Sequence, residues 1–116
     1  MKALLFPGQG VQKVGMMDFL LESDLEIKSL FTQTSNVLDF DLFELVKTGP
    51  EQKLNLTEYA QPAILATSVA IARKKANDLD FSYTAGLSLG EYSALVFAGL
   101  SLIHISEPTR RRWISY

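Results

Sequence analysis

A glycine-flanked serine constrains the fold of this chain more than any other feature. Residues 86–90 read Gly-Leu-Ser-Leu-Gly, between the β-branched and aromatic stretch 81–85 and the apolar stretch 92–98. The glycines allow a sharp turn from strand to helix without Cβ clashes, which leaves Ser88 at the helix N-terminus. There the helix dipole and free backbone N–H groups favour negative charge near the serine oxygen. The pattern predicts a strand–turn–helix unit with Ser88 as a candidate nucleophile.

A second glycine-rich turn follows the first apolar residues of the chain. Residues 2–6 predict a short strand, and residues 7–10 read Pro-Gly-Gln-Gly. Such a turn can bring backbone N–H groups close to a bound ligand. The conformational freedom of Gly8 and Gly10 is also a sufficient structural reason for glycine at these positions.

Apolar spacing and capping residues predict an α/β order of elements. We expect strands at residues 2–6 and 82–85, and helices at residues 24–36, 41–47, 60–76 and 89–99. Ser23 with Glu26 is typical of a capping box, and Asp41 with Glu44 repeats the pattern. The Gly-Pro pair at residues 49–50 should end the second helix.

The helix expected at residues 60–76 is apolar on nearly every face. Pro62 fits only a first helical turn, so we expect this helix to start at Tyr59 or Ala60. A helix that is apolar all round is buried, and its alanines permit close packing on a sheet. Parallel sheets are covered on both faces and normally contain several strands, so two strands alone predict an incomplete sheet.

Composition limits the classes of function. The 116 residues are 47% hydrophobic and 21% charged, with a formal net charge of −2. Neither nucleic acid nor an acidic membrane surface is therefore an expected partner. The chain has no cysteine, which excludes disulfides, thiol catalysis and thiolate metal ligands. Its apolar runs are too short for a secretion signal or a membrane span, so we expect a cytoplasmic location.

Three motifs together resemble a known enzyme family. Residues 6–10 (Phe-Pro-Gly-Gln-Gly), 59–63 (Tyr-Ala-Gln-Pro-Ala) and 86–95 (Gly-Leu-Ser-Leu-Gly-Glu-Tyr-Ser-Ala-Leu) are similar in order and spacing to motifs of bacterial malonyl-CoA:acyl carrier protein transacylases. The resemblance covers residues 1–102, the opening portion of a longer catalytic domain. It implies an incomplete parallel-sheet acyltransferase core, similar to α/β-hydrolases, with a nucleophile elbow.

The resemblance implies transfer of a malonyl group from malonyl-CoA to the phosphopantetheine thiol of acyl carrier protein, for fatty acid synthesis. Ser88 would carry the acyl group as an ester, which splits one difficult transfer into two easier steps. The backbone N–H groups of Gln9 and Leu89 occupy the family's oxyanion-hole positions. The substrate-binding residues would be Gln61, Gly8 and Gly10. For Gln61, helix N-terminal capping is the alternative, and the resemblance implies no metal or redox cofactor.

The general base is missing from the part of the chain that resembles the family. A serine hydroxyl needs a base within hydrogen-bond reach, and the only histidine, His104, lies beyond residue 102. In the family the histidine and a malonyl-binding arginine come from later in the chain, so we expect this chain to be catalytically incomplete. Residues 103–116 depart from the family pattern, and we interpret them as foreign sequence or, if native, as a frayed cationic end.

Three alternatives stay open. A polyketide-type acyltransferase domain would use another acyl group. A serine esterase of the α/β-hydrolase type would share only the turn at Ser88 and would hydrolyse without transfer. A non-catalytic fragment would expose an apolar strand edge, which predicts aggregation or chaperone binding. Glu91 has a structural reading in all cases, because a helix dipole favours a first-turn carboxylate by about 0.3–1 kcal/mol.

Overall fold

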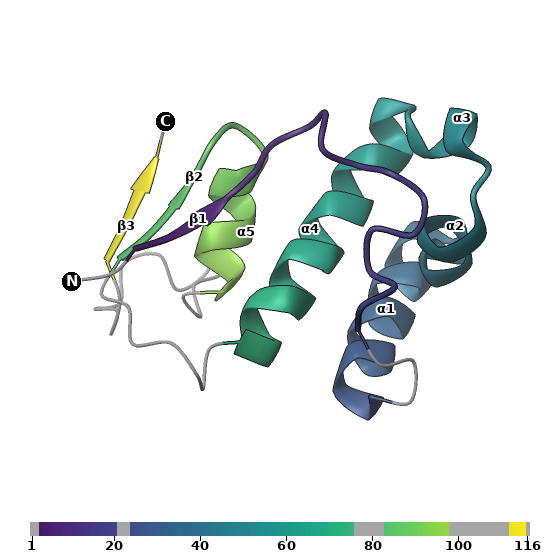
Figure 1. Cartoon of the computed structure of the whole chain (residues 1–116), viewed down its shortest axis with the longest axis horizontal. Coiled ribbons are helices and arrows are strands. Elements are labelled where there is room, and N and C mark those ends of the chain that lie inside the picture. The colour runs from purple at the N-terminus through teal and green to yellow at the C-terminus, as the bar shows by residue number, and fades with distance from the viewer. Residues whose placement is uncertain (1–2, 21–23, 76–82, 98–111, 116) are drawn as a thin grey trace.

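A small parallel sheet and a group of helices make up the structure, a computed structural model that describes residues 3–20, 24–75, 83–97 and 112–115 (Figure 1). The strands are β1 (Ala3–Phe6), β2 (Tyr83–Gly86) and β3 (Arg112–Ser115). The helices are α1 (Leu25–Leu38), α2 (Leu42–Thr48), α3 (Glu51–Leu54), α4 (Thr57–Lys75) and α5 (Gly90–Phe97). The strands pair in parallel in the order β1-β2-β3, with Phe6 opposite Gly86 and Gly86 opposite Ser115. The expected α/β organisation is confirmed.

The start of α1 corrects one expectation. Asp24 caps this helix, and its carboxylate accepts from the backbone N–H groups of Glu26 and Ile27 at 3.0 and 3.2 Å. The capping-box prediction at Ser23, which lies outside the described residues, is wrong, because the aspartate one position later is an equally good cap. The second cap is confirmed: Asp41 accepts from the N–H of Glu44 at 3.0 Å.

The start of α4 also differs from the sequence prediction. The Leu56 carbonyl accepts from the N–H groups of Tyr59 and Ala60 at 2.9 and 2.8 Å, so α4 begins at Thr57. Pro62 therefore lies inside the helix rather than in its first turn, and the expected start at Tyr59 or Ala60 is wrong. The missing proline N–H leaves the carbonyl four residues earlier without its helical donor, at the exposed beginning of the helix. The short helix α3, which the sequence did not predict, leads into this start.

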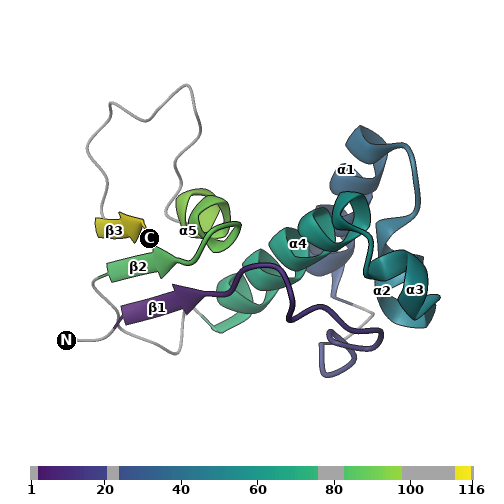
Figure 2. The ribbon, with the colours of Figure 1, turned by 90° about the horizontal axis from the view of Figure 1, so that it is seen from above.

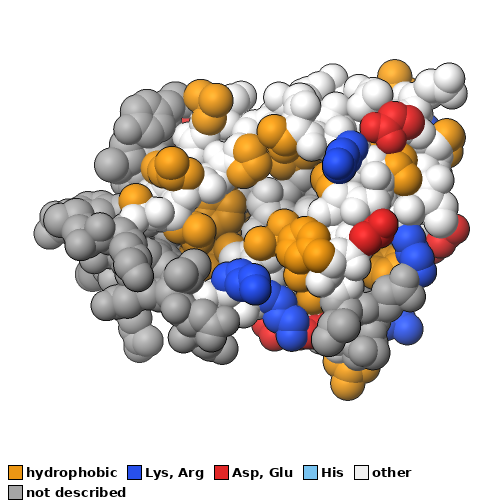
Figure 3. All heavy atoms as spheres, viewed as in Figure 1, with side chains coloured by type: hydrophobic (Ala, Val, Ile, Leu, Met, Phe, Trp, Pro, Cys, Tyr) orange, Lys and Arg blue, Asp and Glu red, His pale blue; other side chains and the backbone are white. Residues whose placement is uncertain are grey.

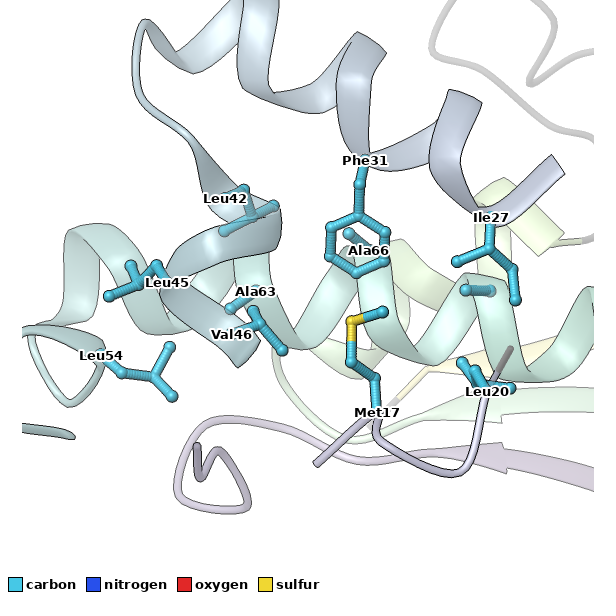
Figure 4. Close-up of a cluster of buried hydrophobic side chains, with 11 residues drawn as sticks. Met17, Leu20, Ile27, Phe31, Leu42, Leu45, Val46, Leu54, Ala63 and Ala66 are labelled. Carbon is cyan, nitrogen blue, oxygen red and sulfur yellow. The ribbon is translucent and has the colours of Figure 1, made fainter. Parts of the chain in front are cut away.

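Two buried clusters hold the helices and the sheet together. The larger one joins α1, α2 and α4 and contains Met17, Leu20, Ile27, Phe31, Leu42, Leu45, Val46, Leu54, Ala63, Ala66 and Ala70 (Figure 4). The smaller one contains Phe6, Ala72, Ala94 and Phe97, and the rings of Phe6 and Phe97 lie 5.8 Å apart. Because α4 contributes to both clusters, it connects the sheet to the other helices (Figure 2), as its apolar sequence predicts.

The two faces of the sheet differ. Leu4 and Phe6 pack in the smaller cluster, whereas Leu5, which points to the opposite face, is 72% exposed. Hydrophobic side chains also reach the surface elsewhere on the molecule (Figure 3). A parallel sheet is normally covered on both faces, so the exposed Leu5 supports the expectation of an incomplete sheet. None of the described helices is long and apolar enough to cross a membrane.

The third strand was not expected. Residues 112–115 pair in parallel with β2, so the interpretation of this end as frayed is wrong for these residues. Without β3 the second edge of β2 would leave backbone groups unpaired, and the Trp-Ile pair at residues 113–114 favours a strand.

Candidate active site

Ser88 lies in the tight turn between β2 and α5. Its φ of 53° is in the left-handed region, which is uncommon for a residue other than glycine. The N–H of Gly90 donates to the Leu87 carbonyl at 2.9 Å, and the N–H of Glu91 donates to the Ser88 carbonyl at 3.0 Å. The predicted strand–turn–helix order is thus present, and Ser88 is exposed at the turn.

The two glycines of this turn are required by close backbone contacts. A Cβ atom on Gly86 would lie 1.9 Å from the carbonyl carbon of Gly90. A Cβ atom on Gly90 would lie 2.1 Å from the carbonyl oxygen of Phe6. Any side chain at either position would therefore push β1, β2 and α5 apart. The glycines allow these elements to meet directly beside Ser88.

The glycine turn after β1 lies against the Ser88 turn. A Cβ atom on the buried Gly8 would lie 2.7 Å from the Leu87 carbonyl oxygen and 3.6 Å from the Ser88 Cβ atom. The N–H of Leu87 donates to the Phe6 carbonyl at 3.2 Å. The carboxyl ends of parallel strands meet at one edge of a sheet, where ligands of α/β proteins commonly bind. The structure thus brings together the two glycine turns that the sequence singled out separately.

Gln9 and Gln61 also come together. The Gln61 Nε2 atom donates to Gln9 Oε1 at 3.4 Å, and the Gln9 Nε2 atom donates to Thr57 Oγ1 at 3.0 Å. Gln61 is the fifth residue of α4 and its amide contacts Gln9, so the alternative in which it caps the helix is wrong. Gly10, with a φ of 116°, follows Gln9 and has no other described atom within 4 Å of the place of a Cβ. This leaves open space beside Gln9.

The backbone N–H groups of Gln9 and Leu89 donate no hydrogen bond to another described residue. Gln9 is exposed and Leu89 is half-buried, immediately before α5. Unpaired N–H groups beside a helix N-terminus can bind an anionic oxygen. The site therefore contains an exposed hydroxyl and two available backbone donors on neighbouring turns.

Thr57 is a polar contact of the site that sequence reasoning missed. Thr57 and Gln61 are four residues apart on α4, the spacing that places two side chains on one helix face. The signal in the sequence is this four-residue spacing of two polar residues at the start of an otherwise apolar helix, and it could have identified Thr57 as part of the site.

The described residues provide no general base beside Ser88. His104 lies outside the described part of the chain, as do Arg110 and Arg111. Within the described ranges, no group of three or more His, Cys, Asp or Glu residues is placed to hold a metal ion. The site as described contains an exposed serine and backbone N–H groups that can act as hydrogen-bond donors.

Comparison with known proteins identifies the family. The model of the acyl transferase domain matches residues 3–105. The malonyl CoA-acyl carrier protein transacylase of Haemophilus influenzae is 50% identical over 102 residues, which cover 84% of this chain and 32% of that protein. The corresponding enzyme of Bacillus subtilis is 47% identical over 98 residues, which cover 84% of this chain and 31% of that protein.

Solved structures agree with these relatives. The crystal structure of an acyl carrier protein S-malonyltransferase from Vibrio cholerae matches with a TM-score of 0.77 and 50% identity, over 84% of this chain and 32% of that chain. A type II PKS acyl-carrier protein in complex with its malonyl-transacylase gives a TM-score of 0.76 and 48% identity, with the same coverage of 84% and 32%. The chain thus spans about a third of the length of these relatives. It belongs to the acyl transferase domain family and corresponds to the amino-terminal portion of a malonyl-CoA:acyl carrier protein transacylase.

Proposed function

We propose that this chain supplies the nucleophile and the oxyanion-hole donors of a malonyl-CoA:acyl carrier protein transacylase. The observation that carries the proposal is the contact between the two glycine turns, in which the position of a Gly8 Cβ lies 3.6 Å from the Ser88 Cβ atom. This contact lies at the residue directly before Gln9, whose N–H group the proposal assigns to the oxyanion hole. A serine with adjoining backbone donors is the arrangement that acyl transfer requires.

In this proposal Ser88 Oγ attacks the thioester carbonyl of malonyl-CoA. The resulting oxyanion is stabilised by the N–H groups of Gln9 and Leu89, which need to lie about 3 Å from it. The general base takes the proton of the Ser88 hydroxyl during the attack and passes it to the coenzyme A sulfur as the carbon–sulfur bond breaks, so that coenzyme A leaves as a thiol and the malonyl group remains as an ester on Ser88. The phosphopantetheine thiol of acyl carrier protein attacks this ester in the second half of the reaction, which restores the serine hydroxyl.

The turn at Ser88 acts as a nucleophile elbow of an α/β-hydrolase-like core in this proposal. Three observations support it: the φ of 53° at Ser88, the glycine contacts on either side, and the start of α5 at Gly90. Gly8, Gly10 and Gln61 line the substrate site. Gly10 has open space around it, and Gln61 lies beside Gln9.

The general base and the arginine that binds the malonyl carboxylate are supplied by the part of the domain that lies beyond this third of the relatives' length. We therefore expect the chain by itself to be inactive. We also propose that residues 1–102 belong to the catalytic domain and that the tail from residue 103 is foreign to it. Sequencing an independent DNA template across codon 102 tests this: a reading frame that continues with a histidine and an arginine supports the proposal, and the same tail followed by a stop codon contradicts it.

The function is tested in a fusion that joins residues 1–102 to the remaining two thirds of the V. cholerae enzyme. We expect this fusion to transfer malonyl groups from malonyl-CoA to acyl carrier protein carrying phosphopantetheine. Ser88→Ala should abolish transfer, whereas Ser29→Ala, an exposed serine in α1, should leave it unchanged. Hydrolysis without transfer would favour the serine esterase, and a preference for another acyl group would favour the polyketide-type domain. The proposed partners are malonyl-CoA and acyl carrier protein, and the proposed location is the cytoplasm.

A further inference from the structure

Hydrogen bonds that involve side chains join the loop that follows β1 to α3, to Asn55 directly after it and to the start of α4. Gln9 Nε2 donates to Thr57 Oγ1 at 3.0 Å, and Gln12 Nε2 donates to Asn55 Oδ1 at 3.1 Å. The backbone N–H of Val14 donates to Glu51 Oε2 at 3.0 Å. We call Glu51, Asn55 and Thr57 the loop brace. The order is reversed along the chain: Glu51 contacts Val14, Asn55 contacts Gln12, and Thr57 contacts Gln9.

Each of the two glutamine side chains in this loop is held at both ends of its amide. Gln9 donates to Thr57 through Nε2 and accepts from Gln61 through Oε1 at 3.4 Å. Gln12 donates to Asn55 through Nε2, and its Oε1 accepts from the N–H of Gly10 at 2.8 Å. A planar amide bound at both ends has a fixed orientation. The brace therefore restrains the backbone from Gln9 to Gln12 as well as the side chains.

Beyond the contact of the buried Gly8 with the Ser88 turn, little apolar packing restrains residues 9–11 of the loop. Gln9, Gly10 and Val11 are exposed, and no other described atom lies within 4 Å of the place of a Cβ on Gly10. Glycine populates a wide range of backbone conformations, so a loop with Gly8 and Gly10 on either side of Gln9 does not fix the Gln9 N–H by itself. The hydrogen bonds of the brace take the place of apolar packing.

We propose that Thr57 is a positioning residue for acyl transfer: its hydroxyl holds Gln9 so that the Gln9 N–H points at the oxyanion formed on Ser88. This inference rests on the proposed function, because it assigns a purpose to the oxyanion hole named there. Thr57 touches Gln9 and not the reacting atoms. A preorganised donor stabilises charge only if it is already in place when the charge develops, so the effect of Thr57 belongs to the transition state rather than to substrate binding.

The first test does not depend on activity and uses the 116-residue chain. Thr57→Val removes the hydroxyl and keeps the shape of the side chain. We expect the backbone ¹⁵N order parameters of Gln9 and Gly10 to fall from rigid values of about 0.85 to below about 0.6. Thr57→Ser should keep the rigid values, and so should Thr34→Val, which removes a hydroxyl bonded to the Leu30 carbonyl within α1. Unchanged order parameters in Thr57→Val would overturn the proposal.

The second test measures transfer by the fusion with the V. cholerae enzyme. Loss of an oxyanion-hole donor lowers kcat by about 10²–10³, so a loosened donor in Thr57→Val should lower kcat by about tenfold or more. The KM for malonyl-CoA should stay within about twofold of the parent value, because Thr57 does not contribute to binding of the substrate in its ground state. Thr57→Ser should restore kcat. A raised KM with unchanged kcat, or no rescue by serine, would overturn the positioning role. An inactive parent fusion would contradict the proposed function, while the order parameters would still decide whether Thr57 holds the loop.

Discussion

Replacing Gly90 with alanine sets two physical effects against each other. Gly90 is the first residue of α5, and alanine is favoured over glycine in a helix by about 0.5–1 kcal/mol. By helix propensity alone, Gly90→Ala should therefore stabilise the chain. The contacts of the residue predict the opposite sign, because a Cβ atom would lie 2.1 Å from the Phe6 carbonyl oxygen and 2.8 Å from the Pro7 carbonyl oxygen.

The size of the effect follows from these contacts. Non-bonded heavy atoms prefer separations of about 3.5 Å, so the end of β1 and the start of α5 would have to separate by more than about 1 Å. Overpacking costs about 1–3 kcal/mol when side chains can adjust. Here the clashing atoms belong to the backbone of two packed elements and cannot rotate away. We expect Gly90→Ala to lower the free energy of unfolding by about 3 kcal/mol or more.

Urea unfolding of the 116-residue chain, followed by far-UV circular dichroism, measures this change. Gly10→Ala is the matched control, because Gly10 has a φ of 116° and no described atom within 4 Å of the place of a Cβ. It should lower the free energy of unfolding by only about 1–2 kcal/mol, through backbone strain without a clash. A Gly90→Ala protein as stable as the parent, or more stable, would refute the contact that brings β1 to the Ser88 turn.

Three further outcomes are expected. Phe31→Ala should lower the free energy of unfolding by about 3–5 kcal/mol in the same urea assay, because Phe31 is 1% exposed and its ring packs edge-on against Phe43; a loss below about 1 kcal/mol would contradict the larger cluster. Asp41→Ala should cost about 1 kcal/mol through loss of a helix cap, and Asp41→Asn should cost much less. The hydrogen bond from Lys74, followed by that from the N–H of Ile27, lowers the pKa of Asp24 in the folded chain. The ionised carboxylate therefore stabilises the fold above the unfolded-state pKa of about 3.9, and this stabilisation is lost as pH falls through the folded-state pKa. Asp24→Asn, which retains a capping oxygen, should therefore weaken the acid dependence of the free energy of unfolding below about pH 4, and an unchanged acid profile would contradict the pairing with Lys74.

Local sequence patterns predicted the elements whose signals lie within a few residues. Asp41 caps α2 as expected, and the glycines around Ser88 mark a turn between strand and helix. The errors arose where the outcome depends on more distant contacts. Pro62 lies inside α4 because the helix begins earlier, at Thr57, where the Leu56 carbonyl accepts the first helical hydrogen bonds. The pairing of residues 112–115 with β2 depends on a strand edge far away in sequence.

In the candidate site, too, the sequence predicts the local motifs but not the contacts between distant residues. The motif around Ser88 and the glycine turn before Gln9 are visible in the sequence, and the structure adds that they touch. Thr57 carries no motif of its own, and its contact with Gln9 joins residues that are 48 positions apart. Side-chain bonds across such a separation follow from the packing of α4 beside the loop, which a single sequence does not specify.

The identity of the acylated residue tests the central claim most directly. The fusion with the V. cholerae enzyme would be mixed with malonyl-CoA without acyl carrier protein, quenched in acid and analysed by peptide mass spectrometry. The account predicts a malonyl ester on the peptide that contains Ser88, which disappears when acyl carrier protein carrying phosphopantetheine is added. No acyl group on that peptide in an active fusion, or full transfer activity in Ser88→Ala, would contradict it.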